Sequence, residues 1–191
     1  MYRATVTTRK VLNEFGEAFQ SASDKLIEQL STLSFSSTLI SPHHPTNAFY
    51  KSDTDLLVLH GGESIGRNST RDCFERELLA IAIRKQIPVL GICRGMQLIN
   101  DFFDGTLRKI EGHVGIVHPI TGNLVGTVNS YHEWAIDLLG RDLTIEATAT
   151  DNSIEAISSR SYSVLGVMWH PERDGCSIPL SELIRRLKFN L

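Results

Sequence analysis

Residues 89–95 of the chain read VLGICRG, and this stretch decides the fold that the sequence predicts. A short run of branched apolar residues, here residues 89–92, is typical of a strand buried on both faces of a parallel sheet. A cysteine between two glycines follows, and residues 95–103 have the apolar spacing of a helix. A strand, a tight turn with a reactive side chain and a helix form a nucleophile elbow. The stretch therefore predicts an α/β fold with Cys93 at the carboxyl end of a central strand.

Strand and helix patterns alternate outward from this stretch. Residues 55–59 repeat the pattern of a buried strand and lead into Gly61-Gly62, and residues 164–169 form another strand pattern ahead of His170. Further strands are expected at residues 2–8, 38–40, 143–148 and 154–157, helices at 26–33, 74–83, 133–139 and 180–187, and a loop at 42–53. Residues 106–131 contain short strands and the turn Gly122-Asn123, which predicts a small antiparallel side sheet. We expect one domain over residues 1–191, a doubly wound, mostly parallel sheet with that side sheet.

Composition and charge exclude several classes of protein. The 191 residues are 41% hydrophobic and 21% charged, as in an ordinary globular domain. The formal net charge is −3 and the basic residues form no long run, so no nucleic-acid surface is predicted. Residues 1–5 lack an apolar signal core, and no stretch has the ~18 apolar residues of a membrane span. We therefore expect a soluble, unprocessed protein without membrane contact.

The chain has three cysteines, Cys73, Cys93 and Cys176, without CxxC spacing. An odd number in this arrangement argues against a disulfide framework and against a thiolate zinc site. A reducing cytoplasm is the expected setting. Because a free cysteine is usually a small buried hydrophobe, Cys73 and Cys176 are expected to be ordinary thiols, and only the elbow distinguishes Cys93.

Three strand ends carry complementary chemistry and should meet at one edge of the sheet. A cysteine attacks as its thiolate, which is a minor species at neutral pH, so Cys93 needs a base. His170 is the expected base, and Glu172 is expected to orient its imidazole. The backbone N–H groups of Gly62 and Arg94 are expected to form an oxyanion hole. Taken singly, a Gly-Gly or His-Pro-Glu segment would more often be a plain turn; the combination favours a cysteine-nucleophile hydrolase.

Histidines elsewhere in the chain are not assigned a role by the sequence. His113, His118 and His132 could form a metal trio, but no carboxylate spacing supports one and thiol chemistry needs no metal, so no metal and no cofactor is expected. His43 and His44 fall in the expected loop.

Four segments resemble, in order and spacing, the class I glutamine amidotransferase-like superfamily. They are LHGG at 59–62, GICRGMQ at 91–97, NSYH at 129–132 and MWHPE at 168–172. Within it, the chain looks most like the γ-glutamyl-γ-aminobutyrate hydrolase (peptidase C26-like) branch. The resemblance implies a flavodoxin-like domain in which Cys93 attacks the γ-carbonyl of a glutamyl group. Water would then hydrolyse the thioester, leaving glutamate and an amine.

The resemblance also implies a set of substrate-binding residues. Gln97 lies one helical turn beyond the nucleophile and would help to seat the glutamyl group, and Asn129, Ser130, Tyr131 and His132 match the substrate-side segment of the family. As a separate hypothesis, the Arg94 guanidinium would pair with a substrate carboxylate or phosphate, with a surface ion pair as the alternative.

The chain departs from this branch where the leaving group would bind. Residues 63–67, ESIGR, lack the proline that many members have there, and the short segment 42–53 suggests an open cleft that would admit a bulky amine. Residues 151–156, DNSIEA, look like those of short relatives that hydrolyse glutamine linked through its amide to a phosphoryl nucleotide in capsule phosphoramidate synthesis. A glutaminase subunit that supplies ammonia to a synthase is a further alternative, whereas the complete triad argues against an inactive binding module. The sequence does not determine the identity of the leaving amine, whether the chain forms a homodimer, or whether it has a synthase partner.

Overall fold

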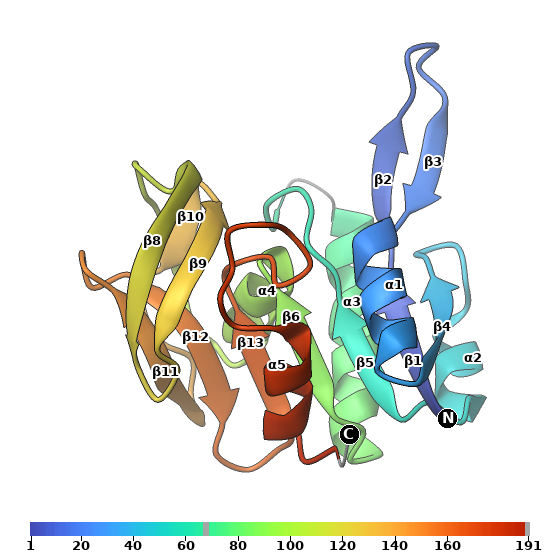
Figure 1. Cartoon of the computed structure of the whole chain (residues 1–191). Helices are drawn as coiled ribbons and strands as arrows, with labels where there is room; N and C mark the ends of the chain where they lie inside the picture. Colours follow the sequence, from blue (N-terminus) through green and yellow to red (C-terminus); the bar gives the residue numbers. More distant parts are fainter. Residues whose placement is uncertain (67–68, 190–191) are drawn as a thin grey trace.

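The computed structural model describes residues 1–66 and 69–189 and is built on a sheet of nine strands. The strands lie in the order β4 (Phe35–Ile40), β1 (Tyr2–Thr7), β5 (Leu56–Leu59), β6 (Val89–Ile92), β13 (Val164–Val167), β12 (Ile154–Ser159), β11 (Leu143–Ala149), β8 (Val114–Gly122) and β9 (Gly126–Tyr131). Neighbours from β4 to β13 pair in parallel, and neighbours from β13 to β9 pair antiparallel. The two kinds of pairing divide the sheet into a parallel and an antiparallel half (Figure 1).

Helices cover both faces of the parallel half. The helices α1 (Asp24–Thr32) and α5 (Leu180–Arg186) pack on one face, and α2 (Thr46–Lys51), α3 (Ser69–Arg84) and α4 (Arg94–Phe102) on the other. In β5, Leu56 and Val58 belong to the cluster under α1 and α5, while Leu57 and Leu59 belong to the opposite cluster. A strand alternates its side chains between two faces, so this continuous apolar run fills both layers. The predicted doubly wound α/β fold is confirmed.

The predicted hairpin around Gly122 is confirmed, but it is part of the large sheet. Strands β8 and β9 pair with each other, and β8 pairs with β11. The small antiparallel sheet consists instead of β7 (Leu107–Lys109) and β10 (Trp134–Ile136). The predicted helix at 133–139 is therefore wrong. Its apolar residues have helical spacing, but the segment is held as a strand by β7 and by the Asn100 amide, which donates to the backbone oxygens of Thr106 and Leu138.

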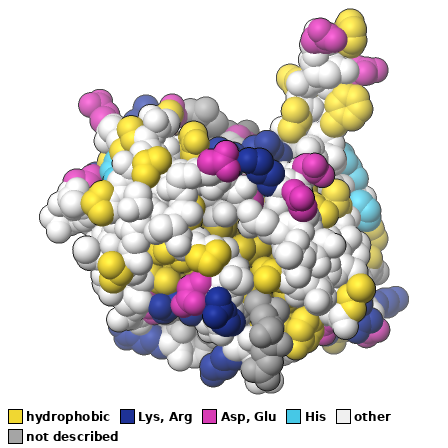
Figure 2. Space-filling model, viewed as in Figure 1, with side chains coloured by type: hydrophobic (Ala, Val, Ile, Leu, Met, Phe, Trp, Pro, Cys, Tyr) yellow, Lys and Arg dark blue, Asp and Glu magenta, His cyan; other side chains and the backbone are white. Residues whose placement is uncertain are grey.

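Two further elements differ from the sequence prediction. The segment 42–53, expected to be a loop, contains α2, which begins after Pro45 and buries Phe49. Strands β2 (Arg9–Leu12) and β3 (Ala18–Ser21) form an unpredicted hairpin whose far end projects from the rest of the molecule (Figure 1, Figure 2). Hydrophobic side chains on it, including Leu12, Phe15 and Phe19, are exposed. In the described part of the chain, no helix has both the length and the apolar character required to cross a bilayer.

Candidate active site

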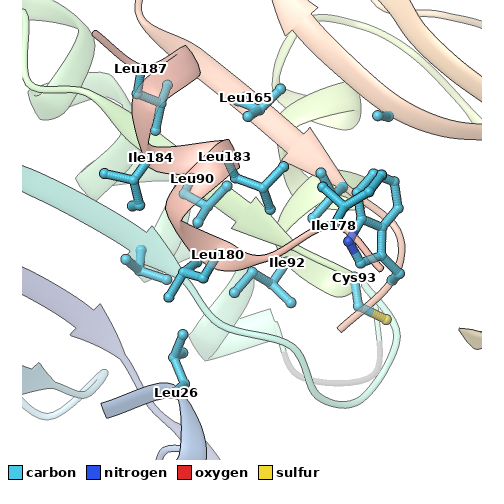
Figure 3. Close-up of a cluster of buried hydrophobic side chains, with 14 of the residues drawn as sticks. Leu26, Leu90, Ile92, Cys93, Leu165, Ile178, Leu180, Leu183, Ile184 and Leu187 are labelled. Atoms are coloured by element: carbon cyan, nitrogen blue, oxygen red, sulfur yellow. The ribbon is translucent and has the colours of Figure 1, made fainter. Parts of the chain in front are cut away.

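Cys93 lies in the turn between β6 and α4, as the sequence predicts. Its φ of 52° and ψ of −103° are an uncommon conformation for a residue other than glycine, and such strain is frequent at functional turns. The flanking glycines allow the turn to pack closely. A Cβ at Gly95 would overlap the backbone oxygen of Leu59, and a Cβ at Gly91 would lie 2.5 Å from Ile99 Cδ1. Figure 3 shows Cys93 at the edge of the apolar cluster under α5.

His170 and Glu172 reach the same sheet edge from β13, which pairs with β6. The backbone N–H of Cys93 donates to Val167 O at 2.7 Å, which places the ends of the two strands side by side. Cys93 and His170 line the same cavity, and His170 Nδ1 lies 2.7 Å from Glu172 Oε1. The ring also lies against Gly61, where a Cβ would be 2.7 Å from His170 Cε1. The structure thus brings the three predicted residues together.

The pKa shifts favour a protonated His170 beside an ionised Glu172. Burial by itself would lower the pKa of His170, but the hydrogen bonds and charges of Cys93 and Glu172 raise it from 6.5 to about 9. Burial would raise the pKa of Glu172, yet its hydrogen bond to His170 and the charge of that ring hold it below its usual value. At neutral pH His170 is therefore an imidazolium held by a carboxylate.

Two cavities open beside Cys93, and Gly62, Glu63 and Tyr131 line both. The larger, of about 360 Å³, is also lined by His170, Arg173 and three residues of the projecting hairpin, Arg9, Lys10 and Val11. The smaller, of about 210 Å³, is also lined by Ser64, Gln97, Val114, His132 and Glu133. The cationic residues Arg9, Lys10 and Arg173 are not predicted from the sequence, because only the three-dimensional fold brings the hairpin and the loop after β13 to one cleft.

The predicted substrate-binding residues separate into two groups. Gln97, Tyr131 and His132 line the cavities, whereas Asn129 and Ser130 are not among the lining residues. The Asn129 amide instead ties β9 to the loop after β13. Its Oδ1 accepts the His170 backbone N–H at 2.9 Å, and its Nδ2 donates to the backbone oxygens of His170 at 2.8 Å and Asp174 at 3.1 Å. Ser130 Oγ donates to the backbone oxygen of His113 at 2.6 Å.

The hypothesis that the Arg94 guanidinium binds substrate is wrong, as is the alternative of a surface ion pair. The guanidinium is buried and forms ion pairs with Glu75 and Asp72 on α3. Arg71 joins this network through Glu75 at 2.9 Å and donates to His60 O at 2.7 Å, just ahead of Gly61-Gly62. The network therefore connects α4 to α3 and to the end of β5. The Arg94 backbone N–H, by contrast, begins α4, where helix amides lack an acceptor within the helix.

Comparisons of the sequence with known proteins find one family. The sequence model of the family described as glutamine amidotransferase class-I matches residues 15–176. The gamma-glutamyl-CDP-amidate hydrolase of Campylobacter jejuni is 34% identical over 133 residues, covering 66% of this chain and 66% of that protein. One of the subunits of the glutamine-hydrolysing GMP synthase from Methanothrix thermoacetophila is 30% identical over 128 residues, covering 62% of this chain and 67% of that one.

Solved structures extend the likeness to nearly the whole fold. A putative GMP synthase subunit from Thermoplasma acidophilum superposes with a TM-score of 0.81 at 17% identity, covering 98% of this chain and 92% of that one. A glutamine amidotransferase from Thermotoga maritima gives a TM-score of 0.67 at 16% identity, with 97% and 80% covered. The predicted flavodoxin-like fold is confirmed. In sequence, the chain spans 66% of the length of the Campylobacter protein and 62% of a putative glutamine amidotransferase from Schizosaccharomyces pombe.

Proposed function

Because this chain belongs to the class I glutamine amidotransferase family, we propose that it is a cysteine-dependent hydrolase of γ-glutamyl amides. One observation carries the proposal: a sulfur, an imidazole and a carboxylate from two strand ends meet beside two cavities. This arrangement has the parts of a nucleophile, a base and an orienting group.

In the proposed reaction, the Cys93 thiolate attacks the γ-carbonyl carbon and forms a C–S bond. The negative charge on the carbonyl oxygen is stabilised by the backbone N–H groups of Gly62 and Arg94. As the C–N bond breaks, His170 gives its proton to the departing amine, leaving a glutamyl thioester. Neutral His170 then takes a proton from water, whose oxygen attacks the thioester. The C–S bond breaks, glutamate leaves, and the thiolate and imidazolium are restored.

The test is release of glutamate by the isolated chain. Glutamine, γ-glutamyl-aminobutyrate, a γ-glutamyl polyamine and a glutamine-linked nucleotide are each incubated with the chain, with its Cys93→Ala variant and with Cys73→Ala, in which an exposed thiol is removed. We expect Cys93→Ala to lower turnover by about 10⁴-fold or more and Cys73→Ala to leave it unchanged. Turnover that survives Cys93→Ala contradicts the mechanism. Activity on glutamine that requires an added synthase would favour a glutaminase subunit instead.

We further propose that the leaving group carries a phosphate. The cavity beside Cys93 is lined by the cationic side chains of Arg9, Lys10 and Arg173. Within residues 1–66 and 69–189, neither Arg9 nor Lys10 has an acidic group at ion-pair distance, whereas Arg173 Nε lies 4.0 Å from Glu172 Oε1 and its guanidinium 4.7 Å from the centre of the Tyr131 ring. Arg9 and Lys10, which have no acidic partner, suit phosphate oxygens better than the chain of a polyamine. The Campylobacter relative, a gamma-glutamyl-CDP-amidate hydrolase by name, supports the same substrate class.

Kinetics on two substrates test this refinement. In Arg9→Gln and Lys10→Gln, KM for the glutamine-linked nucleotide should rise about 10-fold, because each variant loses one charge-assisted hydrogen bond to the phosphate. KM for glutamine should stay unchanged. Lys51→Gln, at an exposed lysine of α2, is the control and should change neither. An equal change of KM on both substrates would mean that these cations do not recognise phosphate.

A further inference from the structure

Three histidines and a glutamate gather in the antiparallel half of the molecule, outside the triad. His113 precedes β8, His118 is on β8, His132 follows β9 and Glu155 is on β12, and all four are buried. One ligand atom each from His113, His118 and Glu155 lie within 4.8 Å of one another. His132 Nε2 lies 3.6 Å from Glu155 Oε1. The sequence predicts no metal here because Glu155 is distant along the chain; strand pairing supplies the carboxylate.

Each histidine has one ring nitrogen bonded to an outward acceptor. His113 Nε2 lies 3.0 Å from Asp151 Oδ2, His118 Nδ1 lies 3.2 Å from Pro119 O, and His132 Nδ1 lies 3.0 Å from Trp134 O. Carbonyl and carboxylate oxygens only accept hydrogen bonds, so these nitrogens carry the proton of the neutral ring. The other nitrogen of each ring therefore presents a lone pair toward the cluster.

Of the inward-facing atoms, Glu155 Oε1 has the Ser153 hydroxyl as a donor at 3.2 Å, although that hydroxyl lies closer to Asp151 Oδ1, at 2.7 Å. Among the described residues, His118 Nε2, His132 Nε2 and Glu155 Oε2 are buried without a hydrogen-bond partner. His113 Nδ1 lies 3.6 Å from Glu155 Oε1. The nearby Ser130 hydroxyl, 3.4 Å from that nitrogen, gives its proton to the His113 backbone oxygen. Buried lone pairs directed at one another are costly, and a cation between them would satisfy all of them.

We propose that His113, His118 and Glu155, with His132 as the fourth ligand, bind a divalent transition-metal ion such as Zn²⁺. Neutral imidazole and carboxylate are ordinary zinc ligands, and zinc-binding histidines typically donate their other N–H to a carbonyl or carboxylate. Bonds of ~2.0–2.1 Å place tetrahedral ligand atoms ~3.3–3.4 Å apart, so the farthest pair among His113, His118 and Glu155 closes by about 1.5 Å on binding. Four protein ligands leave no open position, which makes the site structural.

The site would stabilise one wall of the active-site cleft. His132 and its neighbour Tyr131 line the cavities beside Cys93, and the ligands connect β8, β9 and β12. The metal would thus hold the end of β9 and the residue that follows it against β8 and β12. This role does not depend on which amide the enzyme cleaves.

Metal analysis of the purified chain tests the proposal. All proteins carry Cys93→Ala, so that the active-site thiol cannot bind the metal; they are stripped with a chelator, given Zn²⁺ and desalted. Mass spectrometry of the metal should find about one retained zinc ion per chain, with a higher Tm than the stripped protein. His118→Gln and Glu155→Gln should retain no zinc at this site and show no rise in Tm. His43→Gln, at an exposed histidine, is the matched control and should behave as the parent does.

Glu155→Gln keeps the proposal testable if His118→Gln does not fold. Its amide can donate hydrogen bonds to the inward ring nitrogens and so replaces the cation locally. Circular dichroism establishes that each variant is folded. No retained zinc in the parent, or equal zinc in Glu155→Gln and His43→Gln, would overturn the proposal.

Discussion

At the scale of single residues, His170 lies between a sulfur and a carboxylate, and both neighbours favour its protonated form. The sequence suffices to predict this trio, because each member follows a recognisable strand or turn. The partners of Arg94 are not predictable in the same way. Its guanidinium turns away from the cleft to pair with Glu75 and Asp72, which belong to a helix without any motif.

We expect Glu172→Gln to lower kcat by about 10²- to 10⁴-fold, because the amide no longer stabilises the imidazolium or fixes its tautomer. The pKa of His170 should fall toward 6.5, so the alkaline limb of the pH–rate profile should move to lower pH. Steady-state kinetics across pH measures both effects. Glu28→Gln, at an exposed position on α1, serves as the control, and an unshifted profile in Glu172→Gln would contradict the assigned role.

A second substitution addresses the buried ion pairs. Glu75→Gln leaves Arg71 and Arg94 without the carboxylate they share, and breaking a buried pair typically costs about 3–5 kcal/mol of unfolding free energy. Urea denaturation measures the loss. Glu77→Gln, at an exposed acid on the same helix, should change stability by no more than about 0.5 kcal/mol. Comparable stabilities of the two variants would show that the network contributes little.

At the scale of elements, the strongly patterned strands β5, β6 and β13 are predictable, and segments fixed by distant partners are not. Residues 133–139 have helical spacing, but residues 134–136 within them pair with β7, and the projecting hairpin has no buried face to produce a pattern. The role of Asn129 is likewise fixed by distant partners and is not predictable from the sequence. Its position in a substrate-side motif suggests a ligand contact, whereas its amide spans the gap between β9 and the loop carrying His170.

We therefore expect Asn129→Ala to act through His170. Freed from four hydrogen bonds, the loop should misplace the imidazole and lower kcat by about 10- to 100-fold, with a smaller change in KM. The alkylation rate of Cys93 by iodoacetamide should fall in parallel, since the displaced imidazole no longer lies beside the sulfur. The control is Asn123→Ala, at an exposed asparagine in the turn at the other end of β9. A rise in KM alone would instead indicate direct substrate binding.

At the scale of the whole molecule, the triad should make stability depend on pH. The pKa of His170 is raised from 6.5 to about 9 on folding, so the folded chain holds this proton more tightly than the unfolded chain does. The stabilisation is complete below about pH 6.5 and is lost as the pH rises through about 9. Tm should fall across this window, and should fall less in Cys93→Ala, which lacks one of the groups that raise the pKa. Differential scanning fluorimetry at a series of pH values gives the slope of Tm against pH for the parent and for Cys93→Ala. Equal slopes would show that Cys93 does not affect the protonation of His170.

The sheet also governs how the molecule can move. Because β13 pairs with β6 on one side and β12 on the other, an unbroken ladder of backbone hydrogen bonds runs beneath the cleft. A hinge between the parallel and antiparallel halves of the sheet would have to break these hydrogen bonds. We therefore expect the two halves not to close over a substrate. Adaptation is left to the hairpin β2–β3, which reaches the cleft from the rim. Crystal structures of the substrate-free and substrate-bound protein should accordingly superpose over the sheet and differ most at the hairpin β2–β3.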